Sequence, residues 1–153
     1  MLILLKIKHL SNFLTEYCNN KITNNALDDT QDPVVTNVNG AGIGTLYEDA
    51  DYWVVLESNT INENTCTSSH YQASGAGFST SYSTRLINNA ISNNICTGLM
   101  DAVAIGGGIS LAGEFWANML RMVAESNKIT HNICQSAAMA NSAGVLVQVA
   151  QLI

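Results

Sequence analysis

An eight-residue phrase occurs four times in this chain and constrains its fold more than any other feature. The phrase is N-x-I-[STN]-x-N-x-[CL], and its copies span 20–27, 59–66, 89–96 and 127–134. A second, glycine-rich phrase follows each copy, at 40–43, 75–78, 106–109 and 142–145. Two phrases that recur in the same order predict a repeat architecture, in which stacked units share one continuous core.

The residues before each copy alternate in the manner of a strand with one buried face. Counted back from the first Asn, positions −5 and −3 hold Thr15 and Tyr17, Val54 and Leu56, Thr84 and Leu86, and Met122 and Ala124. Each repeat is therefore expected to form a strand, an Asn corner, a short strand, a second Asn corner, a loop and a Gly-rich strand. Three short strands per repeat cannot bury their inner faces alone. The prediction is an all-β, right-handed parallel β-helix of about four coils.

Stacking explains the asparagines, because equivalent residues of successive coils lie about 4.8 Å apart and their amides can hydrogen-bond along the stack. Asn also tolerates the left-handed conformation that a sharp corner requires. Three further columns are expected inside the helix. They are Ile22, Ile61, Ile91 and Ile129; Leu27, Cys66, Cys96 and Cys134; and Ala41, Ala76, Gly107 and Ala143.

Differences in repeat length are expected in loops, and loops carry function in repeat proteins. The predicted loops span 28–37, 48–51, 68–74 and 97–105. A strand is expected from about Met119, after a loop or single helical turn over 112–118. A longer helix over 114–123 is the alternative, because its apolar residues also fit helical spacing.

The two phrases resemble the repeats of right-handed parallel β-helix proteins, the pectin-lyase-like superfamily. They are most similar to the Asn-rich, GG-[AG]-I repeats of polymorphic outer-membrane proteins and related surface proteins. The resemblance covers about residues 13–150. It implies a solenoid that carries either carbohydrate-active enzymes or non-enzymatic adhesins and surface proteins. The chain departs from the enzymes, since it lacks the clustered Asp and basic residue of pectate lyases and the G-H-G motif of polygalacturonases.

Composition limits the partners. The net charge is −6, with only 6 Lys and Arg, so a nucleic-acid surface is not expected. The most apolar long window, 99–117, contains Asp101 and Glu114, so no membrane span is expected either. At the N-terminus the charges follow the apolar run, which argues for a strand and against a signal peptide. We expect one unit, 1–153, that is part of a longer secreted or cell-surface solenoid.

Acidic residues are the only candidates for a metal site. Two groups lie in the first repeat interval, namely Asp28, Asp29 and Asp32, and Glu48, Asp49 and Asp51. Calcium requires several oxygens that converge from different backbone positions, so these six are the calcium candidates. The simpler interpretation is a charged, solvated loop. Paired acids for glycoside cleavage need a defined separation that the sequence does not establish, so no catalytic residue is assigned.

The histidines and cysteines do not indicate a catalytic or metal site. His131 and Cys134 form a lone H-x-x-C, whereas zinc usually takes four ligands. The repeat places His131 at a solvated corner and Cys134 in a buried column. Stacked Cys side chains point the same way and not toward each other, so thiols are expected. Cys18 is expected to face outward.

Three functions remain open. The first is a non-enzymatic structural or adhesive module that presents a rigid face to a glycan or protein partner. The second is a polysaccharide lyase or glycoside hydrolase fragment. The third, an ice-binding solenoid, needs a regular Thr array that the sequence lacks. The apolar ends, 1–5 and 145–149, do not resemble polar caps, so end-to-end self-association is also expected.

Overall fold

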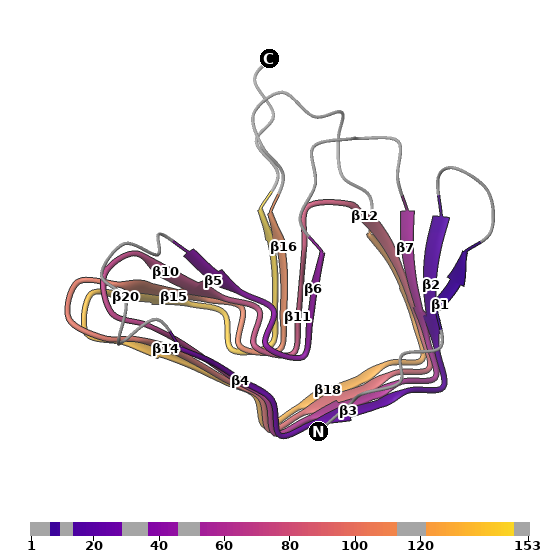
Figure 1. Ribbon diagram of the computed structural model, residues 1–153, viewed down its shortest axis with the longest axis horizontal. Coiled ribbons are helices and arrows are strands. Elements are labelled where there is room, and N and C mark those ends of the chain that lie inside the picture. Colours follow the sequence, from indigo (N-terminus) through magenta and orange to yellow (C-terminus); the bar gives the residue numbers. More distant parts are fainter. Residues whose placement is uncertain (1–6, 10–13, 29–36, 46–52, 113–121, 149–153) are drawn as a thin grey trace, which may run out of the picture.

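The computed structural model describes residues 7–9, 14–28, 37–45, 53–112 and 122–148. These residues form short strands and turns, with no helix among them. The strands build five sheets, A to E, and each sheet contains one parallel strand from each of four coils (Figure 1). The chain is therefore an all-β parallel β-helix, as the repeat predicts.

The strands follow one another around each coil in the order of the sheets. Sheet A contains β1 (Ile7–His9), β2 (Leu14–Cys18), β7 (Trp53–Glu57), β12 (Ser83–Ile87) and β17 (Met122–Glu125). Sheet B contains β3 (Lys21–Thr23), β8 (Thr60–Asn62), β13 (Ala90–Ser92) and β18 (Lys128–Thr130). Sheet C contains β4 (Ala26–Asp28), β9 (Thr65–Ser68), β14 (Ile95–Gly98) and β19 (Ile133–Ser136). Sheet D contains β5 (Asn37–Asn39), β10 (Gln72–Ser74), β15 (Val103–Ile105) and β20 (Met139–Asn141). Sheet E contains β6 (Ile43–Thr45), β11 (Phe78–Thr80), β16 (Ile109–Ala112) and β21 (Val145–Gln148).

The expected three strands per coil are wrong, because each coil has five. Part of the difference is sheet D, whose strands β10 and β15 lie inside the predicted loops 68–74 and 97–105. The inward residues of sheet D are small, as at Ala73 and Ala104, and alanine is depleted in strands. A pattern based on β-branched and aromatic residues therefore missed this sheet.

The register of the four coils matches the predicted columns. Ile22, Ile61, Ile91 and Ile129 are paired in sheet B. Leu27, Cys66, Cys96 and Cys134 are paired in sheet C. Tyr17, Leu56, Leu86 and Ala124 are paired in sheet A. β17 begins at Met122. The predicted start of this strand near Met119 and most of the alternative helix over 114–123 fall in 113–121, which lies outside the described residues.

Two asparagine ladders hold the corners between sheets A and B and between sheets B and C. One contains Asn20, Asn59, Asn89 and Asn127, and the other contains Asn25, Asn64, Asn94 and Asn132, with Nδ2 to Oδ1 distances of 2.9–3.1 Å. The backbone N–H of Asn64 also donates to the Oδ1 of Asn94, and the Nδ2 of Asn94 donates to the Ile61 carbonyl. Each inner amide is thus satisfied on both sides, which makes its burial favourable.

The left-handed residue at each corner is the one before the ladder asparagine, which corrects the expectation that the ladder residue itself adopts this conformation. The second corner has φ of 54–58° at Asn24, Glu63, Asn93 and His131. The first corner has φ of 53–55° at Asn19, Ser58, Asn88 and Ser126. The sharp turn and the stacking amide are therefore supplied by two consecutive residues, and only the amide must be asparagine.

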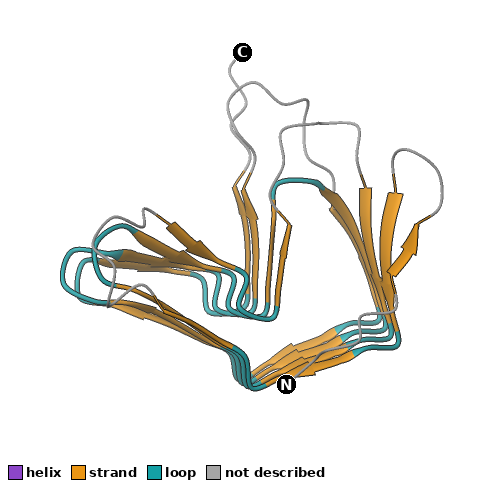
Figure 2. Cartoon of the chain, in the orientation of Figure 1, coloured by secondary structure: helices purple, strands orange, loops and turns teal. Residues whose placement is uncertain are grey.

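The coil encloses two separate cores (Figures 1 and 2). Sheets A, B and E form what we call the body, which is filled by large side chains such as Leu56, Phe78 and Ile91. Sheets C and D face each other in an arm beside the body, and their core contains Val38, alanines, Cys66 and Cys96. Small side chains fill the arm because its two sheets leave little space between them.

Glycines make the waist between body and arm, which we define as the contact of Gly42, Gly77 and Gly108 with the second asparagine ladder. A Cβ on Gly77 would lie 2.5 Å from the Gly108 carbonyl and 3.0 Å from the Asn94 Nδ2. The backbone of the Gly-rich corner therefore packs directly on the ladder amides. The close approach expected for the Ala41 column also occurs, since a Cβ on Gly107 would collide with the Ile133 carbonyl.

β1 departs from the parallel pattern. It pairs antiparallel with β2, with Ile7 opposite Tyr17 and His9 opposite Thr15. Of the strand predicted over 1–8, residues 7 and 8 belong to β1, and residues 1–6 lie outside the described residues. β1 covers the first-coil edge of sheet A.

Candidate functional site

The predicted calcium site falls mainly on residues that the structure does not describe. Of its six acids, Asp28 alone is described, and it is exposed at the end of β4. Asp29, Asp32, Glu48, Asp49 and Asp51 lie outside the described residues. Within the described ranges no three His, Cys, Asp or Glu side chains form a group that suits a metal ion. Calcium binding there remains a prediction.

His131 and Cys134 do not share a site. His131 is exposed at the left-handed corner between sheets B and C, with a φ of 55°. Cys134 points into the arm, where its thiol donates to the Asn141 carbonyl at 3.4 Å. This agrees with the expectation of a solvated corner histidine and a core cysteine.

The cysteines of the arm are poor nucleophiles. All four cysteines of the chain are thiols and not disulfides. A hydrogen bond with Cys134 lowers the pKa of Cys96, but a hydrogen bond with Cys66, burial and charge repulsion outweigh it and raise this pKa to about 12. The hydrogen bond with Cys96, followed by burial, raises the pKa of Cys134. Both thiols are therefore protonated near neutral pH.

The outer side of sheets B and C, with the corner between them, is a regular and accessible surface, which we call the B–C face. Its strands are adjacent in every coil, and the corners between them superpose in the stack (Figure 2). Alternation in each strand points one set of side chains into the core and the other outward. The outward columns are Lys21, Thr60, Ala90 and Lys128; Thr23, Asn62, Ser92 and Thr130; Asn24, Glu63, Asn93 and His131; Ala26, Thr65, Ile95 and Ile133; and Asp28, Thr67, Thr97 and Gln135.

Hydrogen bonds between coils order the polar side chains of this face. The hydroxyl of Ser92 donates to the Asn62 Oδ1 at 2.9 Å, and the Nδ2 of Asn93 donates to the same oxygen at 2.9 Å. On sheet C the Nε2 of Gln135 donates to the Thr97 Oγ1 at 3.2 Å. Amides and hydroxyls are thus held at a spacing that repeats with the coils, about 4.8 Å.

The B–C face has no charge excess. Its outward columns contain two lysines, Lys21 and Lys128, and two carboxylates, Asp28 and Glu63. His131 is the one further titratable side chain in these columns. The face therefore offers hydrogen-bonding groups and carries no net charge, whereas the chain as a whole has a net charge of −6.

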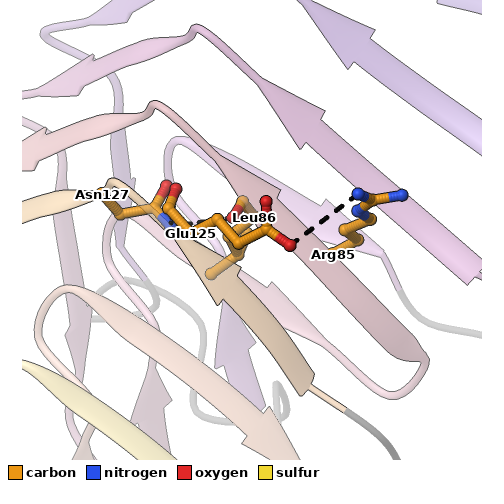
Figure 3. A network of polar contacts seen from close by, with 4 residues as sticks. All are labelled: Arg85, Leu86, Glu125 and Asn127. Atoms are coloured by element: carbon orange, nitrogen blue, oxygen red, sulfur yellow. Dashed lines mark hydrogen bonds and ion pairs between the residues drawn. The ribbon is translucent and has the colours of Figure 1, made fainter.

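The outer side of sheet A is different in character. There Arg85 and Glu125 form an ion pair at 3.8 Å (Figure 3). At the adjoining corner between sheets A and B, the ladder residue Asn127 donates from its Nδ2 to the carbonyls of Leu86 and Glu125. Both charged side chains are at least half exposed, so the pair contributes little to stability. This surface supplies control positions for tests of the B–C face.

An apolar patch at the turns of the arm was not anticipated from the sequence. It comprises Tyr71, Leu99, Met100 and Met139, all exposed. Met100 is 69% exposed and has a φ of 49°, a left-handed conformation that costs energy in a residue with a side chain. The sequence signal was the Leu99-Met100-Asp101 segment within a predicted loop, where two large apolar residues have no periodic partner.

In the part of the chain that the structure describes, no helix combines the length and apolar character that a membrane crossing requires. Every buried side-chain nitrogen and oxygen in that part has a hydrogen-bond partner. Comparison with protein-family models, curated proteins and solved structures found no match to this chain.

Proposed function

We propose that this chain is a non-enzymatic structural or adhesive module that presents the B–C face to a glycan. The observation that supports it best is the set of in-register hydroxyl and amide columns on sheets B and C. A polysaccharide also repeats its hydroxyl groups, so a rigid, periodic set of donors and acceptors can bind it at several points at once. Because the side chains are already ordered by the stack, little conformational entropy is lost on binding.

The chemistry of the face favours a neutral glycan. Its lysines and carboxylates balance, so neither a polyanion nor a polycation is selected by charge. Ile95 and Ile133 lie among the polar columns and provide apolar contact for the C–H surface of a sugar ring. Mixed polar and apolar groups of this kind are typical of sites that fix a ligand's orientation.

The repeat phrases support a further part of the proposal. We place the chain with the pectin-lyase-like β-helices, nearest to the repeats of polymorphic outer-membrane and related surface proteins, and at the cell surface or outside the cell. A polysaccharide lyase or glycoside hydrolase is the alternative within the same fold class, because a fold does not select among functions. The two differ in whether a bound glycan is cleaved.

A glycan array tests the proposal. The protein is applied to neutral and acidic polysaccharides, with calcium and with a chelator, and each bound glycan is then analysed for shorter products. The proposal expects binding to a neutral glycan, no cleavage and no calcium requirement. Cleavage would make the chain an enzyme, and binding to no glycan would contradict the proposal.

A variant pair locates the binding surface. Thr67→Val together with Thr97→Val removes two hydroxyls of one sheet C column and keeps the β-branched shape, so the strands should form normally. Arg85→Gln on the outer side of sheet A is the control. Loss of binding in the valine variant alone supports the B–C face, and equal binding by all three proteins would exclude this hydroxyl column as the binding surface.

A further inference from the structure

Three cysteines form a continuous column in the core of the arm. Cys66, Cys96 and Cys134 occupy equivalent positions of β9, β14 and β19. Cys66 and Cys96 are fully buried, whereas Cys134 is partly exposed. Cys96 lies between the other two in the column, and both Cys66 and Cys134 influence the pKa of its thiol.

The geometry of the column excludes one kind of bond and suits another. Equivalent Cβ atoms in adjacent parallel strands lie about 4.8 Å apart, beyond the range of about 3.5–4.5 Å that a disulfide needs. Two metal–sulfur bonds of about 2.3 Å placed end to end span about 4.6 Å, close to the strand spacing. An ion between two stacked sulfurs would then lie on the line along which the coils stack. Both side chains point across that line, so each sulfur can present a lone pair to the ion.

The surroundings restrict the ion to a low coordination number. The arm core around the thiols contains Val38, Ala73 and Ala104, which supply no ligand side chain. The nearest polar atoms are carbonyl oxygens that accept from the thiols, namely those of Val38 for Cys66, Ile105 for Cys96 and Asn141 for Cys134. Among the described residues no three His, Cys, Asp or Glu side chains are placed so that they could hold one metal ion, so a tetrahedral zinc site does not fit there.

We propose that two neighbouring thiols of this column, with Cys96 as the shared member, bind a soft, thiophilic cation in linear two-coordinate geometry. Soft thiolate ligands select ions such as Cu(I), and Ag(I) and Hg(II) have the same preference. Hg(II) binds with release of two protons, one from each thiol, and leaves a neutral (RS)2Hg unit. Ag(I) or Cu(I) binds with release of one proton, so that one sulfur remains a neutral thiol ligand and the unit is again neutral. Neutrality matters because an uncompensated charge in the apolar arm would be costly.

Cys134 gives the ion a route to the column. It belongs to β19 in coil four and is the most exposed of the three cysteines in the column. An ion can therefore bind first at Cys134 and Cys96. Cys66 extends the column by one further position on the opposite side of Cys96.

The test uses Ag(I) alone, which does not change oxidation state on binding to thiols. The purified chain is loaded in the presence of excess glutathione, and X-ray absorption then counts the sulfur ligands of the protein-bound silver. The expected result is a single ion with two sulfur neighbours in linear geometry. Three or four sulfur neighbours, nitrogen or oxygen neighbours, or complete loss of silver to glutathione would overturn the proposal.

Substitution separates the column from other thiols. In Cys96→Ala the two remaining thiols of the column, Cys66 and Cys134, lie two coils apart, about 9.6 Å, which is too far for one linear ion to bridge. Cys18→Ala, outside the column, is the control. The expected result is loss of the bound ion in Cys96→Ala alone, with circular dichroism to verify folding. Retention of the two-sulfur site in folded Cys96→Ala, or its loss in Cys18→Ala, would contradict the proposal. Should Cys96→Ala not fold, alkylation of the partly exposed Cys134 in wild type with and without silver decides: silver should protect Cys134, and equal alkylation in both samples counts against the proposal.

Discussion

The Nδ2 of Asn64 donates to the Oδ1 of Asn94 in the next coil at 2.9 Å, and both side chains are fully buried. The same Oδ1 accepts the backbone N–H of Asn64, and the Asn64 Nδ2 also donates to the Ile22 carbonyl. A single side-chain type thus satisfies donors and acceptors in three consecutive coils. The ladder replaces the hydrogen bonds that the backbone cannot make at a corner.

Replacement of a ladder residue should therefore be costly. Asn94→Leu removes the acceptor of the Asn64 N–H, one of the two acceptors of the Asn64 Nδ2, and the amide donor to the Ile61 carbonyl. Since each buried unsatisfied group costs about 1–3 kcal/mol, we expect a loss of about 3 kcal/mol or more, measured as a lower midpoint of urea unfolding. The neighbouring Asn93→Gly is the control, because Asn93 is exposed and has a φ of 54°, which glycine adopts readily. Equal midpoints for the two variants would show that the ladder does not stabilise the fold.

The glycine column at the waist allows the same substitution to be compared at equivalent positions of two coils. Gly77→Ala places a Cβ 2.5 Å from the Gly108 carbonyl and 3.0 Å from the Asn94 Nδ2, so body and arm must separate locally. We expect a destabilisation of about 3 kcal/mol in thermal or urea unfolding. The equivalent Gly144→Ala in coil four meets nothing within 4 Å and should be neutral. A tolerated Gly77→Ala would mean that the waist is not close-packed.

The asparagine ladder and the glycine waist show which parts of the fold could be predicted from the sequence. The asparagine ladders could be predicted because identical residues at a fixed spacing have a direct physical use in a stack. The waist could not, because the glycines show only that the backbone approaches something and do not name Asn94 as the neighbour. Sheet D escaped detection for a related reason, since Ala73 and Ala104 are small enough for a thin arm but carry no strand signal.

The candidate surface was less predictable than the core. Thr67 and Thr97 lie in one outward column because β9 and β14 are in register, whereas the sequence places Thr97 in the predicted loop 97–105. The apolar patch around Met100 lies at the turns between sheets C and D. Because the sequence predicts loops in place of sheet D, it does not predict these turns or the patch. Asp28 is the opposite case. The sequence groups it with five other acids as calcium candidates, but those five lie outside the described residues.

The left-handed corners predict a stabilising substitution. Glu63 has a φ of 57° and is exposed, so its side chain incurs the steric cost of this conformation without packing in return. Glu63→Gly should raise stability by about 0.5–1 kcal/mol, since the left-handed conformation costs a residue with a Cβ about 1–2 kcal/mol. Thr60→Gly, exposed at the first position of the sheet B strand β8 in the same coil, should instead destabilise, because glycine is depleted in strands. A drop in the melting temperature of Glu63→Gly would contradict the assignment of strain to this corner.

The raised pKa of Cys96 makes the free energy of unfolding fall with rising pH in the alkaline range. The pKa of Cys96 is raised from 9.0 to about 12 in the folded chain, so the folded state keeps a proton that the unfolded state releases. The contribution to stability is complete below pH 9 and is lost as pH rises from about 9 to about 12. Metal-free wild type should therefore lose more stability over this interval than Cys96→Ala does, as measured by urea unfolding at each pH. Parallel pH profiles for the two proteins would contradict the raised pKa, and Cys18→Ala should follow the wild type.

Binding of a neutral glycan to the B–C face is the central claim, and titration calorimetry with the best array ligand tests it most directly. The account predicts that wild type and Arg85→Gln bind alike, that the Thr67→Val/Thr97→Val variant binds at least about tenfold more weakly, and that a calcium chelator changes neither result. Undiminished binding by the valine variant, or binding abolished by the chelator, would contradict it. The first result would exclude the hydroxyl column as the binding surface, and the second would direct attention to the acidic segments of the first repeat interval.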